Sequence, residues 1–564
     1  MADSILFWNA VALEADRVSH SDPDKREQNG PTLSSRALAI IHLAMYDAYA
    51  GVENNPAAFP PYSTLPGLPP GSSHRDAVAG AAYTTLAALY RAQKDYFDAQ
   101  LDCFDTDPTN DSFAFGKAVG QELLRLREND MDARDCGYRF SMRRGRHRVD
   151  PDNPAQGFYS PYYGAQLEGF AISERHSLKR PPFNNGNDSK YLQALRDVRA
   201  RGIRPDLTGT LPAALFDKRR SGLETLIGIY WGYDGANRLG TPPRLYNKII
   251  RIVAKTIDNP VIGKKNGEGE NARLFAFVNT AMADAGILAW EQKYCHDFWR
   301  PVLGIREHDE NLGPGAPHRA DVNFNDGDPG WLPLGAPSTN STGMKNFTPN
   351  FPAYPSGHAT FGAAAFHMTR MFYGIDPEDK NDDQLFTGVF VSDEFNGGNR
   401  DNDGTVRPRH TRYFPGGLWN MIIENATSRV LLGVHWIFDA FDFTEDKEGN
   451  LVPDLTDEHI GGVGLGLRIA RDIFKSGNCL APKMTAQGAA EPPITTPPKN
   501  SPMPALPKQP ASVWGCADSR IRKGETPEEK EPVQEAFPPG ASEQSTAETT
   551  GQVQSAYPSG ISQK

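Results

Sequence analysis

Three short segments in the second half of this 564-residue chain hold the residues whose types and spacing could do chemistry. The first is KYCHDFWRP at 293–301, the second is PSGH at 355–358, and the third begins with Ser428 and Arg429 and continues to His435. Together they supply two guanidinium groups, an ammonium, a hydroxyl and a free helix N-terminus. These groups match the oxygens of a tetrahedral or trigonal oxyanion. Two histidines beside such a site predict chemistry on the bound anion.

The first segment ends a predicted helix whose apolar residues recur at helical spacing over residues 274–287. Residues three, four or seven apart lie on neighbouring turns, so Trp290, Lys293 and Arg300 are expected along one side of this helix. Pro301 disfavours continued helix and puts the Arg300 guanidinium at or near the helix end. Taken alone, the segment fits an ordinary amphipathic helix with exposed basic residues equally well.

The second segment runs from a proline-stiffened stretch into a helix of small residues that is expected to end near Gly374. Ser356 is well placed as N-cap, which leaves the amides of Gly357 and His358 unpaired and directed outward. Such a helix N-terminus binds oxyanions through its N–H groups and its dipole. Gly357 lets an anion approach the backbone, and His358 can deliver or take a proton there. The alternative is a plain helix cap followed by an exposed histidine.

The third segment lies in an apolar stretch, residues 418–439, which predicts one buried helix. His435 and Asp439 are four residues apart and would share a face, so the carboxylate could orient the imidazole ring. Gly433 would open room beside the histidine. Arg429 stands six residues before His435 and must therefore approach an anion from another side. A core His–Asp pair with an arginine at the helix surface is the alternative.

The conjunction of the three segments decides between these interpretations. Each has its full set of polar groups, on predicted helices that are otherwise rich in apolar and small residues. Because buried cations are costly unless they are paired, a cluster of three positively charged side chains requires an anion. The sequence therefore predicts an oxyanion site with two histidines.

Helical periodicity dominates the first half of the chain, and strand-like alternation is hard to find. Ser34 or Ser35 is a candidate cap for a helix that Gly51 would end, and two more helices are indicated near 78–90 and 119–126. These patterns predict a mainly helical protein.

The remaining chain divides into an irregular stretch, a helical region and a tail. Residues from about 130 to 215 show no periodic pattern, and the basic run RRGRHR at 143–148 within them is interpreted as a solvated loop. Helical pattern resumes near Ser221 and continues to about 476. Beyond Cys479 the chain becomes rich in Pro, Ser, Thr and Glu, which predicts a disordered tail. The stretch NRDNDG at 399–404 imitates a calcium loop, but His410 replaces its final glutamate, so a polar surface turn is expected.

Composition excludes some classes of protein. A formal net charge of -11 argues against nucleic-acid binding. The five scattered cysteines form neither a disulfide framework nor a CxxC metal site. The N-terminus lacks the basic region of a signal peptide, and the most apolar stretch, about 37–52, is too short to span a membrane. A soluble protein is expected, either cytoplasmic or secreted without a recognisable signal peptide, and either monomeric or homo-oligomeric.

The motifs Lys-x6-Arg-Pro, Pro-Ser-Gly-His and Ser-Arg-x5-His-x3-Asp resemble the signature of the vanadium-dependent haloperoxidases. Acid phosphatases of the phosphatidic acid phosphatase type 2 superfamily share this signature. The chain looks most similar to the fungal vanadium chloroperoxidases, in segments that include ILFWN at 5–9 and SRAL at 35–38. The resemblance implies an all-α fold of two four-helix bundles with vanadate in the second. The expected units are 1–220 with a long loop, 221–478 with the vanadate site, and the tail 479–564.

The resemblance also implies a role for each site residue. His435 would be the axial nitrogen ligand of vanadate, His358 the acid–base group, and Lys293 the group that polarises bound peroxide. The vanadate oxygens would be held by Lys293, Arg300, Ser356, the Gly357 amide and Arg429, with His358 close by. Among the remaining positions, Trp290 would line the pocket, Asp439 would orient His435, and Asp234 would pair with Arg429, although a simple Asp-Gly turn explains Asp234 nearly as well. Phe351 stands where bromoperoxidases tend to have a second histidine, so chloride oxidation is expected.

The implied activity is the oxidation of chloride and bromide by hydrogen peroxide to hypohalous acid, which then halogenates small organic acceptors. Vanadium would act as a Lewis acid without changing its oxidation state. The main alternative is a soluble acid phosphatase, because phosphate and vanadate share charge and shape. His435 would then be the nucleophile and His358 the proton donor. A non-catalytic anion-binding protein would have lost a ligand or the acid–base residue, and none is missing.

Overall fold

A computed structural model describes residues 3–131, 138–161, 163–184, 186–314 and 326–486. Most of the expected tail, from residue 487 onward, lies outside the described residues. The sixteen α-helices of the described part are α1 (Ser4–Ser19), α2 (Gly30–Glu53), α3 (His74–Leu89), α4 (Lys94–Cys103), α5 (Asp111–Leu126), α6 (Tyr163–Gln166), α7 (Ser189–Arg201), α8 (Ala213–Phe216), α9 (Gly222–Tyr230), α10 (Pro242–Thr256), α11 (Glu268–His296), α12 (Pro301–Arg306), α13 (Gly357–Phe372), α14 (Gly417–Leu431), α15 (Ile437–Ala440) and α16 (Gly461–Ser476).

Strands are confined to two small antiparallel pairs in the described residues. β1 (Val389–Phe390) pairs with β2 (Arg412–Tyr413), and β3 (Asp442–Glu445) pairs with β4 (Leu451–Asp454). Neither pair is long enough to form a core layer, so the expected all-α class is confirmed.

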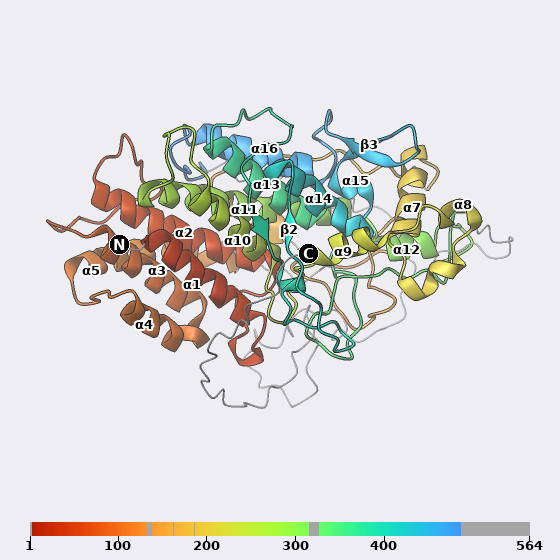
Figure 1. The fold of residues 1–564 in the computed structure, drawn as a ribbon, viewed down its shortest axis with the longest axis horizontal. Coiled ribbons are helices and arrows are strands. Elements are labelled where there is room, and N and C mark those ends of the chain that lie inside the picture. The colour runs from red at the N-terminus through yellow and green to blue at the C-terminus, as the bar shows by residue number, and fades with distance from the viewer. Residues whose placement is uncertain (1–2, 132–137, 162, 185, 315–325, 487–564) are drawn as a thin grey trace, which may run out of the picture.

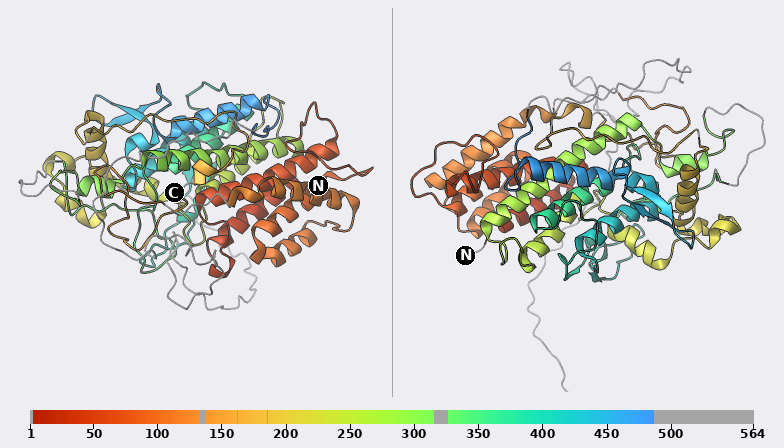
Figure 2. Two further views of the ribbon diagram at one scale, coloured as in Figure 1. Left: turned by 180° about the vertical axis from the view of Figure 1, so that it is seen from behind. Right: turned by 90° about the horizontal axis from the view of Figure 1, so that it is seen from above.

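The long helix α11 connects two groups of helices. Helices α1 to α5 lie together at one end of the molecule, and α7, α8 and α12 lie at the other (Figures 1 and 2). α11 packs against α2 on the N-terminal side and against α13, which in turn packs against α14 and α16. One continuous hydrophobic core runs through both groups. The division near residue 220 into two bundles stays a prediction.

The starts of the helices follow local sequence, although not always the expected residue. The prediction that Ser34 or Ser35 caps a helix was wrong, because α2 already begins at Gly30 with a proline in its first turn. Both serine hydroxyls instead donate to carbonyls inside this helix, at Gly30 and Thr32. The helix end was also misplaced, since Gly51 lies within α2.

The start of α9 shows the opposite outcome. Ser221, where the helical pattern was expected to resume, caps this helix in a full capping box with Glu224.

The irregular stretch 130–215 is more ordered than its sequence indicated. It contains α7, whose Asp188 cap accepts hydrogen bonds from the first turn. The interpretation of the basic run as a solvated loop was wrong for its second half, because His147 and Arg148 are buried. Arg148 forms an ion pair with Glu307, and the Arg146 guanidinium donates to the His296 carbonyl at 2.9 Å. This run therefore packs against the end of α11.

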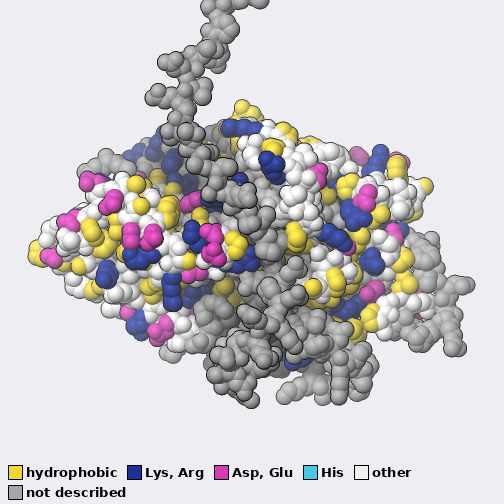
Figure 3. Space-filling model, turned by 90° about the horizontal axis from the view of Figure 1, so that it is seen from below, with side chains coloured by type: hydrophobic (Ala, Val, Ile, Leu, Met, Phe, Trp, Pro, Cys, Tyr) yellow, Lys and Arg dark blue, Asp and Glu magenta, His cyan; other side chains and the backbone are white. Residues whose placement is uncertain are grey.

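One helix of the described residues, α11, is long and apolar enough to cross a membrane, and 94% of its most apolar stretch is buried inside the protein. Helices in the core of a soluble protein commonly have this composition, so the burial favours a core helix. On the face shown in Figure 3, acidic and basic side chains are interspersed and neither sign forms a continuous patch.

Buried His42 on α2 should make stability depend on pH. Burial lowers its pKa to about 4, and its ring contacts the Asn9 amide and the Leu38 carbonyl. Because the unfolded chain takes up this proton near pH 6.5, the contribution of His42 is present above that pH and is lost as the pH falls towards 4. We expect His42→Gln to remove about 2 kcal/mol of the stability difference between pH 7 and pH 5. Urea unfolding of both proteins at both pH values measures this, and equal differences would contradict it.

Candidate oxyanion site

The N-terminus of α13 is built as the second segment predicted. Ser356 is the N-cap, and its hydroxyl oxygen accepts the amide of Ala359 at 3.4 Å. Its own amide donates to the Asp439 carbonyl at 2.8 Å, which connects this cap to the third segment. A Cβ on Gly357 would lie 3.4 Å from the Trp290 ring, so a side chain there would narrow the space over the helix terminus. The predicted Ser356 cap is therefore present.

The first segment differs from its prediction, because it is not one helix. α11 ends at His296, and Asp297 adopts a left-handed conformation with φ of 50°. Lys293 lies in the last turn of α11, whereas Arg300 is the extended N-cap residue of the next helix, α12. The expected alignment of Lys293 with Arg300 along one helix face was therefore wrong. The sharp turn at Asp297, rather than helical spacing, determines where Arg300 lies.

Lys293 is fully buried and its ammonium is surrounded by backbone carbonyls. Nζ donates to the carbonyls of Pro352 at 2.9 Å, Ala353 at 3.1 Å and Pro355. It also lies 5.0 Å from the centre of the Phe351 ring. Burial, together with nearby Arg300, lowers the pKa of Lys293 well below its usual value. The lysine thus fixes the extended stretch that leads into Ser356.

The third segment is interrupted where one continuous helix was expected. α14 ends at Leu431, Gly433 has a φ of +74°, and α15 starts at Ile437. A Cβ on Gly433 would lie 2.4 Å from the Gly202 carbonyl oxygen, so the close approach of that chain requires glycine. His435 therefore stands in a break between helices. The six-residue offset from Arg429, calculated for a regular helix, no longer applies.

His435 is held between a carboxylate and a guanidinium. Its Nδ1 lies 2.7 Å from Oδ2 of Asp439, which also accepts the Trp436 amide at 3.0 Å. Its Nε2 lies 2.9 Å from Nη1 of Arg300. The predicted contact between His435 and Asp439 is present, although Asp439 reaches the ring as part of the cap of α15.

Arg429 and Asp234 form a buried bidentate ion pair. The two guanidinium nitrogens Nη1 and Nη2 lie 2.9 and 2.7 Å from the carboxylate oxygens. Asp234 comes from the loop after α9, 195 positions away in the sequence. The alternative interpretation of Asp234 as a simple turn residue is therefore insufficient.

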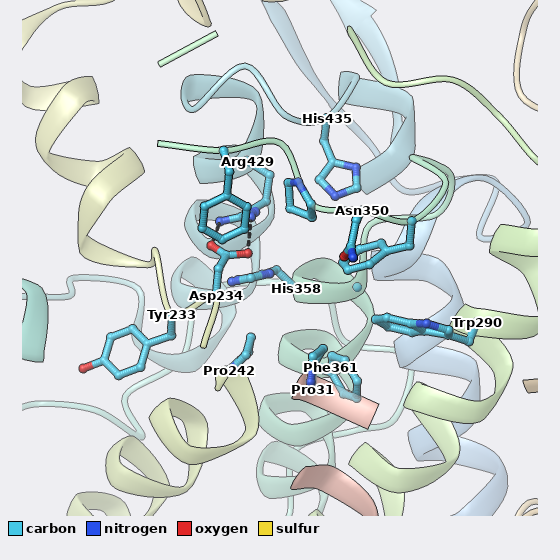
Figure 4. Close-up of a pocket in the computed structure, with 14 residues that line it drawn as sticks. Pro31, Tyr233, Asp234, Pro242, Trp290, Asn350, His358, Phe361, Arg429 and His435 are labelled. Carbon is cyan, nitrogen blue, oxygen red and sulfur yellow. Dashed lines mark hydrogen bonds and ion pairs between the residues drawn. The ribbon is translucent and has the colours of Figure 1, made fainter. Parts of the chain in front are cut away.

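One pocket collects most of the predicted site residues. Figure 4 shows Arg429, His358, His435 and Trp290 around the same space. The lining residues are Pro31, Tyr233, Asp234, Pro242, Trp290, Phe347, Pro349, Asn350, Phe351, Gly357, His358, Phe361, Arg429 and His435. Lys293, Arg300 and Ser356 do not line it and lie fully buried behind its wall. Asn350 and the prolines were not identified from sequence, because no motif or periodicity distinguishes them.

Several buried donors at this site have no hydrogen-bond partner within the described residues. They are Nη2 of Arg300, Nε of Arg429 and Nε1 of Trp290, and the ring atom Nε2 of His358, which is an acceptor in the neutral ring, is also without a partner there. Buried polar atoms of this kind are rare, and each costs about 1–3 kcal/mol when unsatisfied. An oxyanion would supply the missing acceptors. The arrangement therefore fits vanadate or phosphate, and no group of three His, Cys, Asp or Glu in the described chain offers a site for a bare metal cation.

Burial dominates the pKa values at the site, and neighbouring cations add to its effect on the two histidines. Burial, and then repulsion by Arg429, lowers the pKa of His358 to about 3. Burial and nearby Arg300 lower the pKa of His435 well below its usual range. Burial lowers the pKa of Arg300 to about 9 and raises that of Asp439 to about 7. An anion in the pocket would offset the repulsion among these groups.

Asp234 and Arg429 provide a test of this electrostatic arrangement. Asp234→Ala leaves a buried guanidinium without its partner, which should cost about 3–5 kcal/mol. Inorganic phosphate should then raise the melting temperature of the variant more than that of the wild type, because the anion would pair with Arg429. Thermal unfolding with and without phosphate measures both shifts. An equal phosphate shift in the two proteins would show that Arg429 does not face the anion.

Solved structures identify the class of fold. A bacterial vanadium-dependent iodoperoxidase matches with a TM-score of 0.56 and 17% identity, over 84% of this chain and 97% of that one. A holo-type bacterial vanadium-dependent chloroperoxidase matches with a TM-score of 0.54 and 15% identity, over 82% of this chain and 96% of that one. The fold is thus that of the vanadium-dependent haloperoxidases.

Sequence comparison then gives the family. Residues 2–161 match the vanadium chloroperoxidase N-terminal domain, and residues 273–444 match the second helical-bundle domain of the same family. The vanadium chloroperoxidase of Curvularia inaequalis is 33% identical over 95% of this chain and 96% of its own length. The chain belongs to the vanadium chloroperoxidase family.

Proposed function

We propose that this protein is a vanadium-dependent haloperoxidase, which oxidises chloride and bromide with hydrogen peroxide to hypohalous acid. The hypohalous acid would then halogenate small organic acceptors. The observation that supports this most directly is that Trp290 and Arg429, which line one pocket, and Arg300 behind its wall have buried donors without a partner in the described residues, in a chain of the vanadium chloroperoxidase family.

The residues that would hold vanadate come from all three segments. His435 would be its nitrogen ligand through Nε2, since Nδ1 is engaged by Asp439. Arg300, Arg429 and the Gly357 amide would bind its oxygens, with Ser356 and Lys293 supporting them. When bound, vanadate supplies a Lewis acid that activates peroxide oxygen without a change in oxidation state.

His358 is suited to move the peroxide proton. The His358 ring forms a hydrogen bond with the Trp231 backbone, and this bond raises the pKa of His358 against the effect of burial. A bond that raises the pKa is one in which a ring N–H donates to a backbone carbonyl. By elimination Nε2 is the basic atom, and it has no partner in the described residues. Neutral His358 can therefore take up a proton at Nε2 from a substrate in the pocket. Arg300, Arg429 and Lys293 would stabilise the negative charge that develops on the departing oxygen.

Phe351 lines the pocket and packs against Lys293 and Arg300. Its ring centre lies 5.0 Å from Nζ of Lys293, 4.9 Å from the Arg300 guanidinium carbon and 4.8 Å from the Trp290 ring. A polar residue here would let water reach the cations and weaken their effect on the anion. We expect Phe351→His to lower kcat/KM for chloride more than for bromide, because chloride is harder to oxidise. Phe351→Leu should retain the wild-type ratio. Steady-state kinetics with both halides measure this, and an unchanged ratio in the histidine variant would contradict it.

Acid phosphatase activity is the competing proposal, because phosphate and vanadate share charge and shape. The deciding experiment adds orthovanadate to metal-stripped protein and follows halogenation of a dione dye with peroxide plus chloride or bromide. Vanadate-dependent halogenation is expected. Turnover of a phosphate ester with no halogenation would instead support the phosphatase.

A further inference from the structure

The backbone carbonyl of His358 accepts hydrogen bonds from two side chains of other helices. The Asn425 amide on α14 donates to it at 2.9 Å. The Tyr246 hydroxyl on α10 lies 3.2 Å from the same oxygen and 3.1 Å from Oδ1 of Asn425. All three residues are buried, so these bonds do not compete with bulk water. Three helices are thus connected at the residue that lies between the helix N-terminus and the pocket.

Gly362 makes this arrangement possible. A Cβ at this position of α13 would lie 2.4 Å from Nδ2 of Asn425, which is too close for any real contact. The Asn425 amide therefore occupies the space that a side chain would fill. Gly362 is in the interior of α13, where glycine normally costs about 1 kcal/mol relative to alanine. The cost of a glycine inside the helix is consistent with a need for the Asn425 amide beside Gly362.

Asn425 also connects His358 with the anion-binding arginine. It stands four residues before Arg429 on α14, so the two side chains lie on neighbouring turns of one face. The hydrogen bond between the His358 carbonyl and Asn425 connects the first turn of α13 to α14. It therefore fixes the position of the His358 ring relative to the Arg429 guanidinium. Such a tie matters because a shift of about 1 Å in a reacting group can cost roughly 100-fold in rate.

We infer that Asn425 and Tyr246 are positioning residues that hold His358 in register with Arg429, an inference that rests on the proposed function. Neither side chain lines the pocket, so neither touches the reactants. The two act through the backbone carbonyl of His358.

The contact itself can be tested without any activity. Gly362→Ala should lower the melting temperature of the wild type, because the new Cβ displaces the Asn425 amide. In an Asn425→Ala background the same change should leave the melting temperature unchanged or raise it, since alanine favours helix more than glycine does. Equal shifts in the two backgrounds would overturn the proposed contact.

The positioning role is tested by separating catalysis from binding. Asn425→Ala should lower kcat for halide oxidation about 10- to 100-fold while KM for halide and the Kd for orthovanadate change little. Tyr246→Phe should have a smaller effect, because the Asn425 hydrogen bond remains. The matched control is Thr369→Val, which removes a buried hydrogen bond to the Ala365 carbonyl further along α13 and should leave kcat unchanged.

The outcomes separate the two proposals. Suppose that the wild type halogenates. The positioning role alone is then overturned if Asn425→Ala leaves kcat unchanged, or if it lowers kcat and vanadate affinity in parallel. If the wild type hydrolyses a phosphate ester instead, the proposed function fails, and the same kcat-against-KM comparison on that ester tests the role of Asn425, because His358 would be the proton donor. Absence of both activities would overturn both proposals.

Discussion

His435→Ala is expected to abolish orthovanadate binding. In the proposed site His435 is the nitrogen ligand of vanadium, and the other residues contribute hydrogen bonds to oxygen. The Asp439 carboxylate, 2.7 Å from Nδ1, favours the proton on that nitrogen, so the lone pair that would coordinate vanadium is on Nε2, which contacts Nη1 of Arg300 at 2.9 Å. Alanine removes this ligand and also leaves Asp439 without the imidazole. Titration of metal-stripped protein with orthovanadate, followed by equilibrium dialysis, measures the loss.

Two variants define what the loss means. Asp439→Asn should weaken orthovanadate binding about 10- to 100-fold, because it disturbs the orientation of the ligand but keeps it. His42→Gln, at a buried histidine of α2, should leave the affinity unchanged. Orthovanadate binding of wild-type strength in His435→Ala would refute the assignment of the ligand.

The helices themselves were predictable because periodicity and capping are local. The apolar pattern of α11 and the Ser356 cap of α13 depend only on residues within a few turns. The start of α2 was misplaced for a local reason too, since Pro31 suits a first turn and the serines that follow donate to carbonyls of their own helix. The error was the choice of a serine rather than Pro31 as the signal for the start of α2.

The breaks in the chain at the site were not predictable, because their causes are distant in sequence. Gly433 is forced into a left-handed conformation beside the Gly202 carbonyl, a contact that no local pattern encodes. The turn at Asp297, with φ of 50°, separates Arg300 from α11 in a stretch that reads as continuous helix. The motifs therefore identified residues that meet, but not the backbone that brings them together.

The same reasoning explains which residues the sequence did not reveal. Asn425 and Tyr246 reach the His358 carbonyl from 67 and 112 positions away. Each looks in sequence like an ordinary polar or aromatic residue of a core helix. Asn350 directly precedes Phe351, yet its place in the pocket follows from the path of the chain. Only the fold shows that these side chains belong to the site.

His358→Ala is expected to have the opposite effect to His435→Ala. Orthovanadate should still bind, since alanine removes one imidazole ring and leaves the nitrogen ligand, both arginines and the terminus of α13. The rate of chloride oxidation should fall about 100- to 10,000-fold, the range typical for the loss of a general acid–base group. Equilibrium dialysis with orthovanadate and steady-state chloride kinetics measure the two properties on the same preparation.

His358→Gln makes the test of proton transfer sharper. Glutamine keeps a polar side chain near Nε2 but has no group that can take up a proton, so its rate should stay close to that of alanine. If glutamine restored most of the activity, His358 would act by hydrogen bonding alone. The two histidines can be assigned only as a pair: binding must be lost with His435 and kept with His358, while chloride oxidation is lost with both. The reverse pattern would exchange their roles, because the residue that binds the anion and the residue that moves the proton cannot be told apart by activity alone.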